Sequence, residues 1–476
     1  MGGILSLAGP KCREAESNDV FRTDSCKRQK TSLMFFEERP RLIPCLPDEL
    51  SIQILARVPR RYYLNLRLVS QKWKETVTGT ELFLIRKELG LTEEWLYVLI
   101  KDSEDKLLWY ALDPLTKKWQ RLPPMPNVGY EEEPRKGSPG LWLRTILGTS
   151  IRVAGVIRSW LGQNGSMDQM LHGGCSIGAV DGCLYVLGGF SRASAMRCVL
   201  KYDPILNEWY EMTSMSTGRA YCKTGILNNK LYVVGGVSLG RGGLTPLQSA
   251  EVFDPSTDAW SEVPSMPFSR ARLLPTAFFS DLLKPIATGM TSYMGRLVVP
   301  QSLYSWPFIV DVGGEIYDPE TNSWGEMPSG MGEGWPARQA GTKLSVVVDG
   351  ELYAFDPSSS SECGKIKVYD QKEDAWKVVI GKVPVGDFTD SESPYLLTGF
   401  HGKIHVLTKD AYQNIAVLQA DLRNDLDSAS ASASLSADSW HEPSVSQPDS
   451  ETVVWKVLST KDFGSAELVN CQVLEL

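Results

Sequence analysis

Residues 231–260 read LYVVGGVSLGRGGLTPLQSAEVFDPSTDAW, and two signals in this stretch decide the fold. A short apolar run closes on Gly235-Gly236, and further on Phe253 precedes an Asp-Pro pair that is followed by Trp260. Asp-Pro suits the first two positions of a type I turn, because proline presets the backbone and Asp can bond its own chain two residues on. The stretch therefore predicts a strand that ends at Phe253, a turn, and a strand that opens with Trp260.

The Asp-to-Trp part of this pattern repeats along the chain. A Trp follows an Asp at the same spacing in five places: Asp113 and Trp119, Asp203 and Trp209, Asp254 and Trp260, Asp318 and Trp324, and Asp370 and Trp376. An aromatic residue precedes the Asp in four copies, and Asn or Asp stands four residues after it in four. Asn and Asp tolerate the left-handed backbone that a hairpin with a bulge requires. An internal repeat of this kind predicts a repeat architecture.

A second hairpin signal lies upstream of three copies. Tight-turn residues precede short apolar runs at Asp181-Gly182, Asn229-Lys230 and Asp349-Gly350. Each unit is therefore predicted to contain four short antiparallel strands. A degenerate sixth unit runs over 396–458. The first unit lacks an inner strand, so we expect the apolar run 466–474 to return and complete it, which would remove an exposed sheet edge.

An apolar strand that closes on Gly-Gly, followed by an aromatic residue, Asp-Pro and Trp, resembles the kelch repeat. The resemblance implies that residues 92–476 form an all-β six-bladed kelch β-propeller. Two insertions interrupt the pattern, at 128–172 and 421–451. Apolar residues near helical spacing in the first predict an amphipathic helix that docks on its own propeller or on a partner. The second is rich in Ser, Ala and Asp and is predicted to be a solvated loop.

Residues 41–90 do not fit this pattern and are predicted to form a small all-α module. The run Leu46-Pro47-Asp48-Glu49-Leu50 opens a helix, and apolar residues at helical spacing continue it as far as Pro59. Further helical runs are expected over 64–73 and 81–89. A module of about 45 residues buries only a small share of its surface, and its apolar content exceeds what it could bury alone. The surplus predicts a partner.

This module resembles the F-box motif, and the two domains together resemble the F-box/kelch-repeat proteins, a family abundant in plants. By motif position, the resemblance implies an adaptor-contact or core set of Leu46, Pro47, Ile54, Leu55, Leu66, Val69 and Trp73. The alternative is that Ile54, Leu68 and Trp73 only hold the bundle together. The stretch Arg60-Arg61-Tyr62-Tyr63 differs from the acidic or small residues that are typical of the motif.

The resemblance implies a non-catalytic function. The F-box would bind the Skp-type adaptor of an SCF-type cullin–RING ubiquitin ligase, and the propeller would bind an unknown target protein for ubiquitination and proteasomal degradation. The alternative is a kelch interaction scaffold outside any ligase. N-myristoylation at Gly2 would tether such a scaffold to a membrane, because the first six residues fit the spacing of that signal. Residues 1–40 are otherwise polar and predicted to be disordered.

Loops at one end of a propeller are the expected site of target binding. The candidate rim consists of Arg192, Arg197, Arg219, Arg241, Arg270, Arg272, Trp306, Trp335 and Arg338. Arginine with Trp nearby would suit an acidic or phosphorylated peptide. The alternative, for Arg219 and Arg270 in particular, is that the repeated Arg caps or pairs with a neighbouring blade.

Composition limits the remaining classes of function and the expected cellular compartment. A net charge of −8 disfavours nucleic-acid binding. Nine cysteines without a C-x-x-C motif argue against a disulfide framework and a zinc site, so we expect a reducing compartment, the cytoplasm or the nucleus. The chain has no run of about 18 apolar residues, and no membrane-spanning helix is predicted.

Metal chemistry is not expected either. An oxidoreductase propeller would need convergent copper ligands, but the four histidines, His172, His401, His405 and His441, do not form a ligand set by their spacing. No cofactor is therefore predicted.

Overall fold

The computed structural model describes most of the chain outside its terminal segment and longer connections. The described residues are 41–126, 173–191, 194–240, 243–269, 284–305, 308–333, 335, 344–356, 364–380, 383, 395–410, 412–421 and 454–476. Gly2, the predicted insertion at 128–172 and nearly all of that at 421–451 lie outside them. The chain divides into two compact units, Met1–Ser51 and Ile52–Leu476, and the boundary falls within the first helix.

Helices occupy the region that the sequence assigns to an α module. They are α1 (Asp48–Ala56), the 3-10 turn η1 (Arg60–Tyr62), α2 (Tyr63–Leu66), α3 (Gln71–Thr78) and α4 (Thr80–Glu88). The single helical run expected over 64–73 is wrong, because Ser70 has extended backbone and its side chain accepts a hydrogen bond from the Trp73 amide at 3.1 Å. A serine in this role starts a new helix. The turn before it places Leu68 and Val69 outside both helices.

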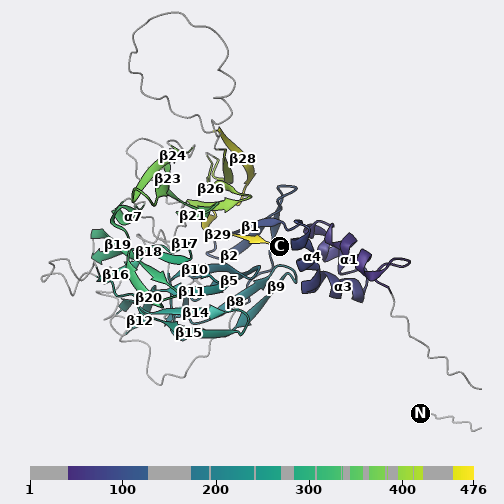
Figure 1. Cartoon of the computed structure of the whole chain (residues 1–476), viewed down its shortest axis with the longest axis horizontal. Coiled ribbons are helices and arrows are strands. Elements are labelled where there is room, and N and C mark those ends of the chain that lie inside the picture. The colour runs from purple at the N-terminus through teal and green to yellow at the C-terminus, as the bar shows by residue number, and fades with distance from the viewer. Residues whose placement is uncertain are drawn as a thin grey trace, which may run out of the picture. The chain divides into compact units, whose positions relative to one another are not determined.

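In the described part of the chain after the helices, six sheets of four or five strands form the blades of a propeller (Figure 1). From the inner to the outer strand, blade 1 contains β29 (Glu467–Glu475), β1 (Glu94–Lys101), β2 (Leu107–Leu112) and β3 (Trp119–Arg121); blade 2 contains β4 (Ser176–Val180), β5 (Cys183–Leu187), β8 (Val199–Asp203) and β9 (Glu208–Met212); blade 3 contains β10 (Lys223–Leu227), β11 (Lys230–Val234), β14 (Ala250–Asp254) and β15 (Ala259–Val263).

The other three blades complete the ring. Blade 4 contains β16 (Lys284–Ala287) with β17 (Thr291–Tyr293), β18 (Arg296–Ser305), β19 (Phe308–Asp318) and β20 (Ser323–Glu326); blade 5 contains β21 (Ser345–Val348), β22 (Glu351–Asp356), β23 (Lys365–Asp370) and β24 (Ala375–Ile380); blade 6 contains β25 (Leu396–Phe400), β26 (Lys403–Lys409), β27 (Ile415–Asp421) and β28 (Val454–Lys461). The six-bladed propeller predicted from the repeats is therefore confirmed.

Blade 1 is assembled from both ends of the propeller sequence. Strand β29 pairs antiparallel with β1, with Trp95 opposite Leu474 and Val98 opposite Cys471. Beyond the strand, Leu476 and Glu93 exchange two backbone hydrogen bonds, at 2.8 and 2.9 Å. The apolar run 466–474 is thus the inner strand of the first blade, as predicted from the sequence. Backbone pairing closes the ring.

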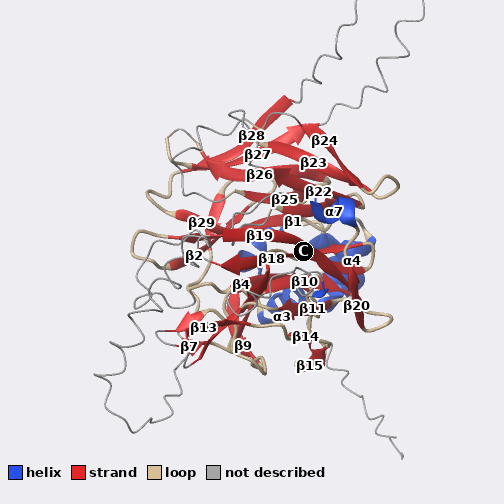
Figure 2. Ribbon diagram, turned by 90° about the vertical axis from the view of Figure 1, so that its left-hand side faces the viewer, coloured by secondary structure: helices blue, strands red, loops and turns tan. Residues whose placement is uncertain are grey.

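The two faces of the ring carry different kinds of connection between strands. Within each blade the strands are antiparallel, so the turns between the first two strands and between the last two lie on one face, here called the turn face. The other connections leave the opposite, loop face. On the loop face, blade 2 adds the hairpin of β6 (Phe190–Ser191) and β7 (Ser194–Ala195), and blade 3 adds that of β12 (Val237–Gly240) and β13 (Gly243–Pro246). Figure 2 shows how strands dominate this part of the chain.

The repeated Asp forms the turn that its sequence predicts. In blade 3, Asp254 accepts a hydrogen bond from the Ser256 amide at 3.0 Å, and Asp258 has a φ of 50°. The other copies use the same bond, at Asp113, Asp203, Asp318 and Asp370. The aromatic residue before the Asp also has a role, since the Tyr202 hydroxyl donates to Asn207 at 2.8 Å across the turn.

The tight turns are confirmed as well, with one shift. Asp181 and Gly182 both have positive φ, of 52° and 65°, as a two-residue hairpin turn requires. In blade 3 the turn residues are Asn228 and Asn229, one position earlier than expected. In blade 4, a double glycine, Gly313-Gly314, lies inside β19.

The double glycine has a steric purpose. Gly188 has a φ of 58°, and a Cβ atom there would lie 2.1 Å from the Arg219 carbonyl oxygen. A side chain at this position would therefore push the blade apart from the connection that leads to the next blade.

The core lies between neighbouring blades. Each adjacent pair of blades shares a buried apolar cluster, and that between blades 1 and 2 contains Trp95, Tyr97, Leu184, Val186 and Tyr202. The other five pairs have equivalent clusters. Across this boundary, the Trp209 ring of blade 2 lies 6.4 Å from the Trp109 ring of blade 1, measured between ring centroids.

The Trp of each of the five Asp-to-Trp repeats also donates a hydrogen bond to the blade before it. Trp209 donates to the Pro123 carbonyl at 2.9 Å, and Trp260 donates to that of Thr213 at 2.8 Å. In both cases the acceptor stands four residues after the Trp of the preceding blade. Trp324 continues the series with Pro264. The same register closes the ring: Trp119 donates to the Ser459 hydroxyl at 3.0 Å, four residues after Trp455.

Trp209 offers a test of this inter-blade bond. Replacing Trp209 with Phe keeps an aromatic ring and removes the donor, so we expect the free energy of unfolding to fall by about 1 kcal/mol. Replacing it with Ala also removes the ring, and about 3–5 kcal/mol should be lost. Urea titrations followed by far-UV circular dichroism measure both values. The neighbouring, more exposed Tyr210 on the same strand is the control, and Tyr210→Phe should change little.

Candidate adaptor-binding and target-binding surfaces

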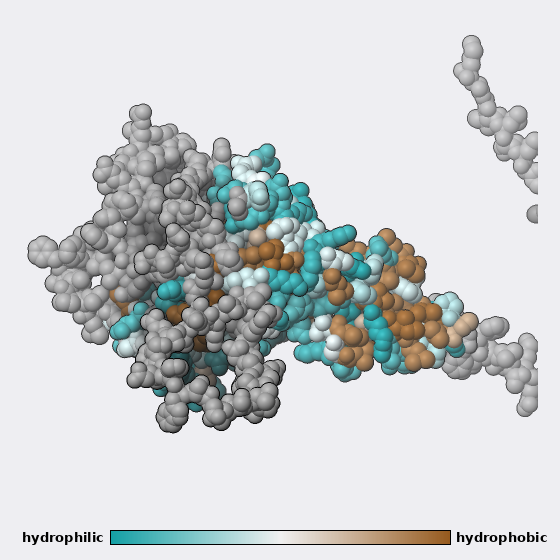
Figure 3. All heavy atoms as spheres, turned by 90° about the horizontal axis from the view of Figure 1, so that it is seen from above, coloured by the Kyte–Doolittle hydropathy of each residue, from teal (hydrophilic) through white to brown (hydrophobic). Residues whose placement is uncertain are grey.

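Large apolar side chains are exposed on the helices. Leu68 is 84% exposed and Val69 is 59% exposed in the turn between α2 and α3, and Ile54 on α1 is 47% exposed. Leu64, Leu84 and Leu89 are exposed as well. Figure 3 shows these helices coloured largely as apolar surface. An exposed apolar surface on so small a group of helices is typical of a protein interaction site.

The predicted adaptor set divides into two groups. Ile54, Val69 and Pro47 are exposed, while Leu46, Leu66 and Trp73 are partly buried. Leu55 is 1% exposed and belongs to the core of the helices, together with Tyr63, Val77 and Leu82. Leu55 therefore stabilises the fold and is not available for contact.

The exposure of Leu68 contradicts the alternative in which it only holds the bundle together. Leu68 lies in the turn between α2 and α3, and it is the most exposed large apolar residue of the described residues 41–90. Ile54 is not a bundle residue either. The helical run expected over 64–73 would include Leu68. A new helix starts after Ser70 instead, and this start leaves Leu68 in the turn before it. A Ser before a polar helical run is the signal that would have found it.

A buried arginine holds the end of the helical segment (residues 52–90) to the start of the propeller. Arg86 of α4 is 3% exposed and donates to the carbonyl oxygens of Ala56, Val58 and Leu91, at 2.9, 3.0 and 2.6 Å. It also pairs with the Glu93 carboxylate at 3.0 Å. Five carbonyl, hydroxyl and carboxylate oxygens, that of Tyr63 included, thus surround one guanidinium. Glu93 directly precedes β1.

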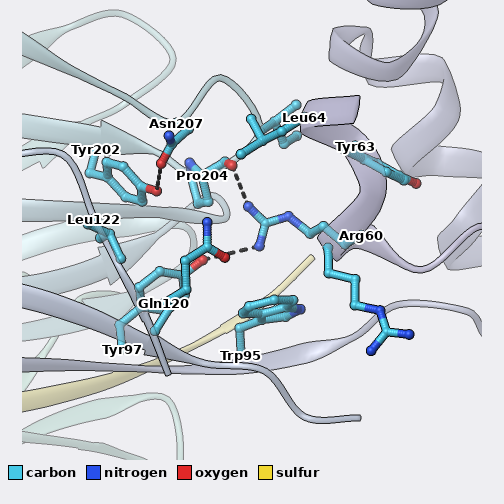
Figure 4. Close-up of a pocket in the computed structure, with 13 residues that line it drawn as sticks. Arg60, Tyr63, Leu64, Trp95, Tyr97, Gln120, Leu122, Tyr202, Pro204 and Asn207 are labelled. Carbon is cyan, nitrogen blue, oxygen red and sulfur yellow. Dashed lines mark hydrogen bonds between the residues drawn. The ribbon is translucent and has the colours of Figure 1, made fainter. Parts of the chain in front are cut away.

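A second arginine reaches from the helical segment into the propeller (Figure 4). Arg60 of η1 donates to the Tyr97 hydroxyl at 3.1 Å and to the Pro204 carbonyl, and its guanidinium lies 5.4 Å from the Trp95 ring centroid. Burial raises the pKa of Tyr97 in spite of the nearby Arg60, so the phenol stays neutral and its oxygen accepts the bond. The surrounding cavity of about 40 Å³ has room for water rather than for a ligand.

These contacts explain the unusual residues at 60–63. Arg61 lies 3.7 Å from Asp113 of the first blade, and Arg67 donates to the Leu206 carbonyl of the second at 2.8 Å. The sequence marks Arg60-Arg61-Tyr62-Tyr63 only as a departure from the motif, and nothing in it identifies acceptors that lie far along the chain.

The candidate rim is only partly visible. Arg192, Arg241, Arg270, Arg272, Trp306 and Arg338 lie outside the described residues. Arg197 is exposed on the loop face, between β7 and β8. Trp335 is partly buried and packs edge-on against Trp376 at 5.5 Å, so its ring is occupied at least in part by the propeller itself.

Arg219 is not a rim residue, which corrects that prediction. Its side chain is fully buried and donates to Glu251 through Nε at 2.9 Å and Nη2 at 2.7 Å, and to the Gly235 carbonyl at 3.0 Å. Burial raises the pKa of Glu251, but hydrogen bonds from Ser216 and Arg219 outweigh it and hold this pKa below the usual value. The pair joins the connection after blade 2 to blade 3, as the alternative interpretation of the repeated Arg expects.

Histidine positions give no sign of a metal centre in the parts of the chain that are described, where no cluster of three potential ligands occurs. His405 is 1% exposed in β26, and its Nδ1 lies 3.0 Å from the Lys403 carbonyl. Because a carbonyl can only accept, Nδ1 carries the proton of a neutral ring. Burial lowers the pKa of His405 to about 4.

The Arg219–Glu251 pair should be costly to break. In Arg219→Ala, a buried carboxylate loses its charged partner, and we expect the free energy of unfolding to fall by about 3–5 kcal/mol. The control is Arg296→Ala, whose side chain is 58% exposed where it pairs with Asp318, and which should change the stability little. Denaturant titration at neutral pH compares the two, and equal losses would contradict the structural role of Arg219.

His405 should make the stability depend on pH. The unfolded chain binds a proton at the ordinary His pKa of 6.5, whereas folded His405 binds one only near pH 4. Its contribution is therefore complete above pH 6.5 and is lost as the pH falls toward 4, to a total of about 3 kcal/mol. The difference in stability between wild type and His405→Leu, measured between pH 7 and 4, should change in favour of the variant. A constant difference would exclude this assignment.

Comparison with known proteins supports both parts of the architecture. The F-box domain family matches residues 43–84, and the Kelch motif family matches residues 172–216 and 218–267. None of the helices in the described ranges has the length and apolar character needed to cross a membrane.

Several similar proteins come from Arabidopsis thaliana. F-box/kelch-repeat protein At1g22040 is 65% identical over 478 residues, which cover 100% of both chains. F-box protein AFR is 26% identical over 66% of this chain and 68% of its own. F-box/kelch-repeat protein At1g30090 is 28% identical over 74% of this chain and 73% of its own. With a relative of such identity over the full length, and with both motifs in place, this chain belongs to the F-box/kelch-repeat proteins.

Proposed function

We propose that this protein is the substrate receptor of an SCF-type cullin–RING ubiquitin ligase. Its helices bind the Skp-type adaptor, and its propeller binds the target protein. The observation that carries the proposal is an F-box with exposed apolar side chains joined directly to a closed kelch propeller. The receptor performs no bond chemistry under this proposal. It raises the effective concentration of the target beside the charged ubiquitin carrier.

The exposed residues rank the adaptor contacts. Full burial of a Leu or Val side chain is worth about 1.5–3 kcal/mol, so the residue with the most exposed area has the most to gain from binding. Leu68 and Val69 satisfy this condition in neighbouring positions, and Ile54 adds a third exposed side chain. Leu46 and Pro47 join the proposed contacts by their motif positions. Leu55 is excluded because it is already buried.

On the target side, the proposal assigns binding to the connections of the propeller. Arg197 is the rim residue that the structure describes as exposed, and it lies on the loop face. We propose that this face receives an acidic or phosphorylated segment of the target, since guanidinium groups bind carboxylates and phosphates well. Proximity labelling with the wild-type protein and with Arg197→Ala would identify proteins whose labelling depends on this residue.

The adaptor contact gives the decisive test. The double variant Leu68→Ala/Val69→Ala should weaken binding of a recombinant Skp-type adaptor by about 10- to 100-fold, because apolar area is no longer buried on association. The matched control is Val378→Ala/Val457→Ala, two exposed valines on the outer strands β24 and β28. Titration calorimetry measures both affinities.

Two outcomes would contradict the proposal at different levels. Unchanged affinity of Leu68→Ala/Val69→Ala, or retention of the adaptor by Leu46→Ala/Pro47→Ala in a pull-down, would refute the proposed contact residues. Failure of the wild-type protein to bind any Skp-type adaptor would refute the ligase function itself and favour an interaction scaffold outside a ligase.

A further inference from the structure

One acidic residue connects the helical segment to the propeller. Oε1 of Glu93 accepts hydrogen bonds from the Arg60 amide and from Arg86 Nη2, both at 3.0 Å. Its Oε2 accepts from the Trp95 indole at 3.1 Å. The carboxylate thus holds η1, α4 and the first propeller strand at the same time. The backbone of Glu93 is also occupied, because it pairs with Leu476.

Arg60 extends this junction across two blades. Its side chain contacts Trp95 and Tyr97 of β1 in blade 1 and the Pro204 carbonyl in the turn that follows β8 in blade 2. Arg67 donates to Leu206 in the same turn. Figure 4 shows the guanidinium of Arg60 between Trp95, Tyr97 and Pro204. Contacts with two blades resist rotation of the helical segment, whereas a connection through residues 89–93 alone would permit it.

The position of this junction on the ring has a functional meaning. The turn between β8 and β9 lies on the turn face, as does the end of β29 next to Glu93. Arg197 belongs to the connection between the second and third strands of blade 2 and lies on the loop face. The junction and the proposed target contact are therefore on opposite faces of the propeller, with the depth of a blade between them.

We propose that Arg60, Glu93 and Arg86 form a positioning joint that fixes the direction in which the propeller extends from the adaptor-binding helices. Through this joint, a target bound on the loop face is held at a constant orientation to the ligase. The functional part of this inference rests on the proposed ligase function, but the existence of a rigid joint does not. None of the three residues contacts the adaptor or the target under this proposal. Each acts by fixing the helical segment (residues 52–90) against the propeller.

Distance measurements test the joint directly in the isolated full-length protein. Fluorophores are coupled through p-azidophenylalanine at Lys74 in α3 and at Tyr412, an exposed residue of blade 6. Single-molecule energy transfer should give one narrow distance distribution in the wild type. Arg60→Ala should broaden the distribution, and so should Arg60→Lys, because an ammonium group keeps the charge but cannot bond Tyr97 and Pro204 through two separate nitrogens.

A matched arginine provides the control. Arg57, in the turn after α1, is exposed and donates to the Gln53 carbonyl of that helix at 2.7 Å, so Arg57→Ala should keep the narrow distribution. Adaptor affinity should be equal in all variants. A distribution that stays narrow in Arg60→Ala and Arg60→Lys would overturn the joint, and so would a loss of adaptor affinity in these variants, which would assign Arg60 to the folding of the helices. If the wild type binds no adaptor, the ligase function fails while the distance distributions still decide whether the joint exists.

Discussion

Closure of the ring by β29 and β1 is the constraint on which the rest of this structure depends. Each blade contributes half of two apolar clusters, so no blade can bury its faces unless it has a neighbour on both sides. Blades 1 and 6 obtain theirs only because the last strand of the chain pairs with the first strand of the propeller. The pairing also removes the open sheet edges that would otherwise invite association with another chain.

Side-chain hydrogen bonds also join each blade to its neighbour. The indole of each described Trp in the repeats donates to the blade before it, and the register of four residues recurs from Trp209 to Trp324. In blade 5, Trp376 bonds Met331 instead, because the helix α7 (Ser329–Glu333) is inserted after β20. Blade 1 substitutes the Ser459 hydroxyl for a backbone carbonyl. The repeat therefore encodes how one sheet attaches to the next as well as how each sheet folds.

This distinction explains how much of the molecule could be predicted from its sequence. The Asp turns and tight hairpins were predictable, because Asp254 and Ser256 are two positions apart and their bond depends on local geometry. The exposure of Leu68 was not, since it depends on whether Ser70 continues a helix or starts one. The specific partners of Arg60 and Arg219 could not be predicted for a different reason. Their acceptors Pro204 and Glu251 are 144 and 32 positions away, and only the folded ring brings them together.

The pairing of Glu93 with Leu476 also constrains the order in which the chain can fold during its synthesis. Thr92 and Glu475, which share a hydrogen bond, are 383 positions apart, so β1 leaves the ribosome long before its partner exists. Contacts of such separation form late and slowly. The helices can fold early, but the carboxylate that aligns them with the propeller reaches its final surroundings only after the last strand has been translated. A chain truncated before β29 would therefore lack the strand pairing that closes the propeller. Only the full-length chain could align the helices correctly with the propeller.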